Sequence, residues 1–191
     1  MTITPDPLVG EITDPESVNV PENIYSFYKE KNKTDSEREV YPIAVIKQQL
    51  VSGINYAVLC RTTDKSNSKE EYYAISLIYI DLQNNIREQE FYVTDIETNL
   101  GKKTDFWSEP EDVSFPKEYE YILQELSDQT GESSLKPIAL VSSKKNNGMN
   151  LCILCEIVEE DSGFGELCFV YVHLNSLYEN PQLLEVKLIV N

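Results

Sequence analysis

The chain has 191 residues, of which 41% are apolar, so it can bury a core in one large or two small domains. Asp and Glu number 33 against 16 Lys and Arg, which gives a formal net charge of −17. Because such a chain repels phosphate backbones and anionic lipid, neither nucleic acids nor membrane surfaces are expected as partners.

The N-terminal stretch MTITPDPLVG has neither a basic start nor an apolar run, and no segment of the chain reaches the length of a membrane span. A cytoplasmic location is therefore expected for the sequence as written, or secretion if a leader was removed from it. Within this stretch Leu8 and Val9 place two apolar side chains directly before Gly10.

A helix is predicted after this stretch. Pro21 suits the first turn of a helix, and Ile24, Phe27 and Tyr28 follow with the spacing i, i+3, i+4 of one helical face.

Four extended runs follow the helix. In the second run Tyr56, Val58 and Cys60 alternate with other residues, which places these three side chains on the core face of a strand. The pattern predicts a twisted antiparallel sheet with the helix packed on one face, while the other face can stay wet. The runs cover Tyr41–Gln49, Ile54–Thr62, Tyr72–Asp81 and Arg87–Thr94.

Two turns between these runs have an unusual composition. In the first, QLVSG, the glycine suits the positive φ of a sharp turn, but folding alone does not require an apolar residue such as Val51 at a loop tip. In the second, DLQNNI, the apolar residues are Leu82 and Ile86. The first turn comprises Gln49, Leu50, Val51, Ser52 and Gly53.

The second half of the chain repeats the first half. DPESVNVPENIYSFYKEK begins at Asp14 and EPEDVSFPKEYEYILQEL at Glu109, an offset of 95 that continues without a gap. The sequence therefore predicts an α+β protein of two tandem modules, 1–98 and 99–191, each in the order β-α-β-β-β-β. The same offset matches Ile75, Leu77 and Tyr79 with Val170, Val172 and Leu174.

The residues that could carry chemistry are interpreted as structural. Cys152 and Cys155 have the CxxC spacing, but in a strand they point to opposite faces, so buried reduced thiols are expected there and at Cys60 and Cys168. His173 is the only histidine, too few for a His-rich metal site. Neither an enzyme nor a cofactor is expected.

The element order, with QxVxG in the turn before the third strand and LVG near the N-terminus, resembles the cystatins, which inhibit papain-like cysteine peptidases. The resemblance covers the first module. It implies that the N-terminal strand and two hairpin turns fill the peptidase cleft without being cleaved. The cystatin second turn usually carries Pro-Trp, which DLQNNI lacks. The resemblance implies these peptidase-binding residues: Leu8, Val9, Gly10, Gln49, Leu50, Val51, Ser52, Gly53, Leu82 and Ile86.

The second module keeps only the glycine of the first turn. KKNNG stands in place of QLVSG at residues 144–148, and Lys103-Thr104-Asp105 stands in place of LVG. The expected function is therefore reversible, competitive inhibition of a papain-like cysteine peptidase through the first module. Two alternatives stay open: a tandem cystatin-like protein with another target, such as a latexin-like metallocarboxypeptidase inhibitor, and a non-inhibitory protein-binding or scaffold module.

Overall fold

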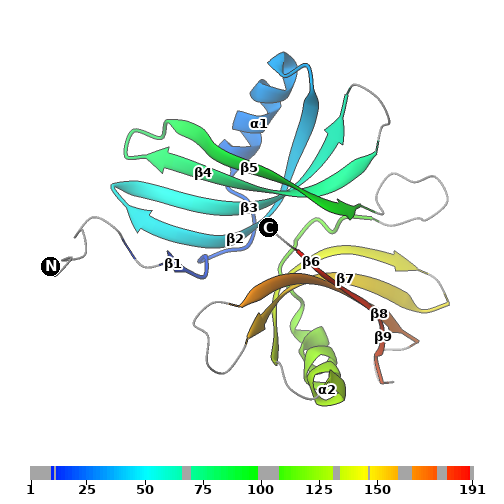
Figure 1. The fold of residues 1–191 in the computed structure, drawn as a ribbon. Coiled ribbons are helices and arrows are strands. Elements are labelled where there is room, and N and C mark those ends of the chain that lie inside the picture. The colour runs from blue at the N-terminus through cyan, green and yellow to red at the C-terminus, as the bar shows by residue number, and fades with distance from the viewer. Residues whose placement is uncertain are drawn as a thin grey trace, which may run out of the picture. The chain divides into compact units, whose positions relative to one another are not determined.

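The computed structural model describes residues 10, 12–65, 70–98, 108–130, 134–145, 147–158, 165–175 and 180–189. The chain divides into two compact units, Met1–Glu97 and Thr98–Asn191. Each unit combines a helix with an antiparallel sheet, so the fold is α+β, as the sequence predicts (Figure 1).

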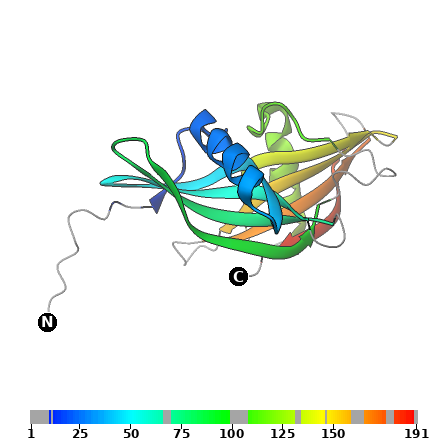
Figure 2. The ribbon, with the colours of Figure 1, turned by 90° about the horizontal axis from the view of Figure 1, so that it is seen from above.

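The first unit has one helix on a five-stranded sheet. The strand order is β1-β2-β3-β4-β5, and every neighbouring pair is antiparallel. The helix crosses one face of this sheet (Figure 2). The elements are β1 (Ile12–Thr13), α1 (Glu22–Thr34), β2 (Arg38–Val51), β3 (Gly53–Asp64), β4 (Glu71–Asp81) and β5 (Ile86–Glu97).

Helix α1 begins where its sequence predicts. Pro21 is the N-cap residue, Glu22 lies in the first turn, and Lys31 and Lys33 lie in the last turn, so these charges complement the helix dipole.

The core of the first unit lies between α1 and the sheet. Ile24 and Tyr28 of the helix are buried in one cluster with Val58 and Cys60 of β3, and Tyr56 packs against this cluster. The predicted core face of the second extended run is therefore confirmed.

The second unit has a four-stranded antiparallel sheet in the order β6-β7-β8-β9. Ile122 and Leu126 of its helix share a core with Leu151, Ile153 and Cys155, which lie 95 residues after Tyr56, Val58 and Cys60. The elements are η1 (Lys117–Tyr119), α2 (Glu120–Thr130), β6 (Ser134–Lys145), β7 (Met149–Val158), β8 (Glu166–Leu174) and β9 (Gln182–Leu188).

The predicted first strand of the second unit is not formed within its described part. Two isolated bridges occupy that place instead, between Ser108 and Ser143 and between Ser114 and Ala139. The order β-α-β-β-β-β therefore holds for the first unit, while the second unit is described as helix followed by four strands.

The two sheets match at an offset of 95 residues in all but one strand. In the first unit Val58 pairs with Ser76, and in the second unit Ile153 pairs with Val170. Ile153 lies 95 residues after Val58, but Val170 lies only 94 residues after Ser76. The predicted equivalence of Ile75 with Val170, and of the residues that alternate with them, is therefore wrong. The connection before β8 is one residue shorter than that before β4, and a shift of one residue turns every side chain of a strand to the other face.

The sheet face that points away from each helix is also apolar. Strand alternation places Leu59 and Ile75 of the first unit, and Leu154 and Phe169 of the second, opposite the helix-side clusters. All four side chains are buried. The expectation that this face can stay wet is therefore wrong, because apolar residues occupy both faces of the central strands.

Candidate functional site

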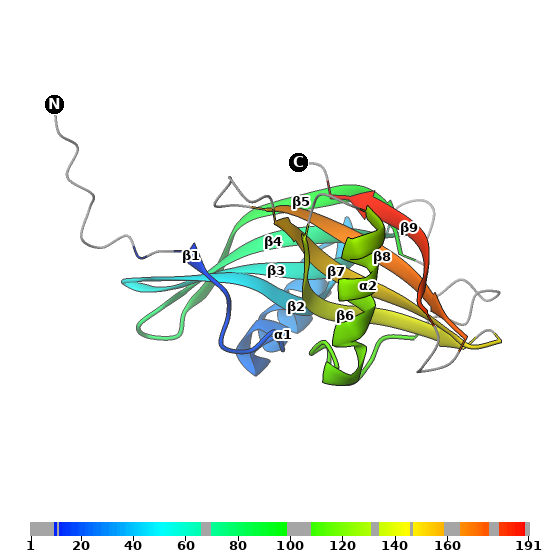
Figure 3. The same ribbon diagram turned by 90° about the horizontal axis from the view of Figure 1, so that it is seen from below.

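The segments singled out in the sequence meet at one end of the first sheet. Ile12 of β1 pairs with Gln49 at the end of β2, and Gly53 pairs with Asp81 at the end of β4. Figures 1 and 3 show β1 and the β2–β3 and β4–β5 turns at this same end. Leu8 and Val9 lie outside the described residues. We call this end of the sheet, made of Gly10, Gln49–Gly53 and Asp81–Ile86, the loop edge.

The β2–β3 turn requires a glycine for its own geometry. Val51 pairs with Gly53 across a single intervening residue, Ser52. Gly53 has a φ of +147°, which L side chains rarely adopt, and a Cβ there would lie 2.3 Å from the carbonyl oxygen of Ile80. The hydroxyl of Tyr79 donates a hydrogen bond of 2.9 Å to the carbonyl of Ser52, which fixes the turn from below.

Leu50, and not Val51, presents the most exposed apolar side chain of this turn. The side chain of Leu50 is 69% exposed, whereas Val51 is half-buried. Leu50 pairs with Ile54, and Ile54 pairs with the buried Ile80, so these three residues form an apolar row that runs from the core to the open edge. The turn therefore offers apolar area that a partner could desolvate.

The β4–β5 turn is held by a carboxylate. Asp81 accepts hydrogen bonds of 2.8 Å from the backbone N–H groups of Gln83 and Asn85 and from the side-chain amide of Asn85. The bonds from Asn85 are the main reason that the pKa of Asp81 lies below its usual value. Leu82 is 76% exposed on this turn, while Ile86 is half-buried and packs against the core.

Gln49 contacts its own N-terminal segment. Its side-chain Nε2 donates a hydrogen bond of 2.9 Å to the carbonyl of Gly10, and its Oε1 accepts one of 3.0 Å from Nδ2 of Asn55. A Cβ on Gly10 would lie 1.9 Å from the carbonyl oxygen of Leu50, so this glycine allows the N-terminal segment to lie close to β2.

Asn55 and Tyr79 also belong to this site, although neither residue is among the predicted contact residues. In the β2–β3 hairpin, where Val51 pairs with Gly53, Asn55 lies opposite Gln49. Asn55 also pairs with Tyr79 of β4. The spacing of two polar residues around the turn was therefore the signal that could have identified Asn55.

The corresponding turn of the second unit has a different chemistry. Gly148 has a φ of +135°, and a Cβ there would lie 3.1 Å from Cε1 of His173. The ring nitrogens of His173 lie 2.5 Å from Oδ1 of Asn150 and 3.0 Å from Oδ1 of Asn175. The ring of His173 thus lies next to Gly148, just as the ring of Tyr79 lies next to Gly53. The part of this turn that the structure describes exposes no large apolar side chain.

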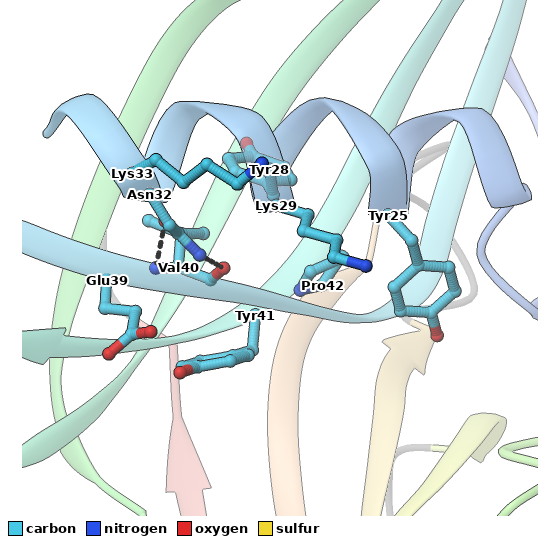
Figure 4. A pocket seen from close by; sticks show the side chains of 9 residues that line it. All are labelled: Tyr25, Tyr28, Lys29, Asn32, Lys33, Glu39, Val40, Tyr41 and Pro42. Atoms are coloured by element: carbon cyan, nitrogen blue, oxygen red, sulfur yellow. Dashed lines mark hydrogen bonds between the residues drawn. The ribbon is translucent and has the colours of Figure 1, made fainter.

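A groove of about 460 Å³ lies between α1 and the first half of β2 (Figure 4). At its centre the side-chain amide of Asn32 donates to the carbonyl of Val40 at 2.8 Å and accepts from the N–H of Val40 at 2.9 Å. Tyr25 and Tyr41 also line the groove, both on the same side of these bonds in Figure 4. Since β1 pairs only with Gln48 and Gln49, the Asn32 amide satisfies a stretch of β2 that β1 does not reach. We therefore interpret this groove as a covered strand edge.

The four cysteines are buried, and none of them forms a disulfide. Burial raises the pKa of the Cys60 and Cys155 thiols and raises the pKa of Cys168 to about 11, so thiolate formation is disfavoured. Across the described residues, no three His, Cys, Asp or Glu side chains gather as a metal ion would need. Neither of the two α-helices described is long and apolar enough to cross a membrane.

Compared with known proteins, the chain matches no protein-family model and no curated protein. The likeness to cystatins therefore rests on the residues and the element order of the chain itself.

Proposed function

We propose that the protein is a reversible, competitive inhibitor of papain-like cysteine peptidases that acts through the loop edge of its first unit. The observation that carries this proposal is the alignment of three backbone segments at one sheet end, where the two turns expose the apolar side chains of Leu50 and Leu82. An edge of this kind suits a cleft that binds extended peptides, because docking removes the two leucines from water.

Each part of the loop edge has a role in this proposal. The exposed Ser52 brings backbone close to the cleft wall, while the buried Gly53 shapes the turn behind it. Leu50 and Val51 provide apolar contact on the two faces of the turn. Strand pairing on both sides of the turn prevents it from presenting an extended peptide bond to the peptidase thiolate. The protein would therefore block the cleft without being cleaved.

The second unit is proposed to keep a related fold without an inhibitory edge. Lys144 and Lys145 stand where the first unit has Gln49 and Leu50. Moving their ammonium groups into an apolar cleft would desolvate charge without a partner, which costs more than the contact returns.

The direct test measures papain activity on a small peptide substrate with increasing amounts of the full chain. The expected result is inhibition that raises KM, leaves kcat unchanged and is reversed on dilution. Absence of inhibition at about 10 μM protein, which corresponds to a binding free energy weaker than about −7 kcal/mol, would contradict the proposal. Carboxypeptidase A, assayed in parallel, tests the metallocarboxypeptidase alternative.

A further inference from the structure

Polar side chains line the face of the loop edge that lies opposite the Leu50 row. Gln49 pairs with Asn55, Asn55 pairs with Tyr79, and Tyr79 pairs with Arg87, so the four residues are neighbours across β2, β3, β4 and β5. We call Gln49, Asn55 and Tyr79 the brace row.

The brace row is bonded to both segments that the proposed function requires. At one end, Asn55 donates to Gln49, and Gln49 donates to the carbonyl of Gly10 in the N-terminal segment. At the other end, the hydroxyl of Tyr79 donates to the carbonyl of Ser52 in the β2–β3 turn. The ring of Tyr79 is itself covered by a guanidinium group, that of Arg87, at 5.0 Å from the ring centroid.

We propose that the brace row positions the N-terminal segment and the β2–β3 turn relative to each other, and so raises affinity for a peptidase without touching it. Strand β1 contains only Ile12 and Thr13, which is too short to hold the segment firmly by backbone pairing alone. The bond from Gln49 to Gly10 therefore provides a large share of the attachment. A segment ordered before docking loses less conformational entropy on binding.

The second unit carries different side chains at the positions equivalent to the brace row. Lys144 stands at the position of Gln49, and an ammonium group cannot accept a hydrogen bond from an amide. Its strand partner Asn150 is bonded instead to His173. Asn150 therefore faces His173 in the second unit, whereas Asn55 donates to Gln49 in the first unit.

The first experiment tests the positioning itself and does not depend on any peptidase. Hydrogen exchange of the β1 amides is measured in the full chain for the wild type, Gln49→Glu and Gln48→Glu. Gln49→Glu keeps the side-chain shape but removes the donor to Gly10, so β1 should exchange at least tenfold faster. Gln48→Glu adds the same charge on the other face and should change exchange little. Unchanged exchange in Gln49→Glu would overturn the proposal.

The second experiment rests on the proposed function and separates positioning from direct contact. Papain inhibition is measured for Gln49→Glu in the full chain and in a chain that lacks residues 1–10. We expect at least a tenfold loss in the full chain and less than a threefold loss in the shortened chain. Equal losses would mean that Gln49 does not act through the N-terminal segment, which would overturn its proposed positioning role. If the wild type does not inhibit papain, the proposed function fails, while hydrogen exchange still decides whether the brace exists.

Tyr79→Phe tests the other end of the row. It removes one hydroxyl and keeps the ring under Gly53. The loss of inhibition should be severalfold and equal in the full and shortened chains, because Tyr79 acts through the turn. Unfolding midpoints in urea should stay close to the wild type. If Tyr79→Phe inhibits as well as the wild type, the hydroxyl of Tyr79 does not position the turn.

Discussion

At the scale of single residues, Gly53 fixes the geometry of the loop edge. Its φ of +147° is one that residues with a side chain rarely adopt. A Cβ at this position would also lie only 2.3 Å from the carbonyl oxygen of Ile80. We expect Gly53→Ala to lower the free energy of unfolding by about 1–3 kcal/mol, measured by urea denaturation. Ser52→Ala, at the exposed neighbouring position, should change it little. Equal midpoints for the two variants would contradict this account of the turn.

The buried thiols give the protein a defined response to alkaline pH. Burial raises the pKa of Cys60 above the ordinary value of 9.0, so the thiol ionises in the unfolded chain before it does in the folded one. Stability is therefore unaffected by this group below pH 9 and falls as pH rises above it. At pH 10 the loss from Cys60 should be about 1.4 kcal/mol. The free energy of unfolding, measured in urea at pH 8 and pH 10, should fall less between these pH values in Cys60→Ala than in the wild type. Identical decreases in the two proteins would contradict this role of Cys60.

At the scale of elements, β2 shows how the fold protects an exposed strand edge. The Asn32 side chain of α1 makes both hydrogen bonds that a neighbouring strand would make to Val40. Asn32→Ala removes both bonds and should lower the free energy of unfolding by about 1–3 kcal/mol. Asn23→Ala, on the exposed first turn of the same helix, is the matched control. A similar small effect for both substitutions would show that the Asn32 bonds do not stabilise the edge.

Most elements could be predicted from the sequence because apolar periodicity and turn residues determine them. The helix after Pro21 and the core face of Val58 and Cys60 follow from such local patterns. The correspondence between residues of β4 and β8 could not be predicted. The connection before β8 is one residue shorter, which hardly changes the overall offset of the repeat but turns each side chain of the strand to the opposite face of the sheet.

The candidate site was predictable in position but not in the role of each side chain. The turns are visible in the sequence, and the strand register brings them to one edge. The exposure of Leu50 and Val51 depends on which face of the sheet each side chain lies on. Gln49 contacts the N-terminal segment of its own chain because its side chain donates a hydrogen bond to the carbonyl of Gly10. Both features arise from contacts between segments far apart in the chain.

At the scale of the whole molecule, exposed leucines occur in both units but differ in their surroundings. Leu50 lies on the loop edge, while Leu184, which is 49% exposed, lies on β9 of the second unit, where no contact residue is predicted. Leu50→Asp should raise the inhibition constant for papain at least tenfold, about 1.4 kcal/mol, because it places a charge in the proposed interface. Leu184→Asp should leave inhibition unchanged. Equal effects of the two substitutions would show that Leu50 is not a specific contact.

The central claim is that one inhibitory edge, in the first unit, serves the whole chain. Titration of active papain with the full chain tests this most directly, because the equivalence point counts the peptidase molecules that each chain blocks. The account predicts one papain per chain, and loss of tight titration in Val51→Asp without a change in the urea midpoint. Two papain molecules per chain, or undiminished titration by Val51→Asp, would contradict it.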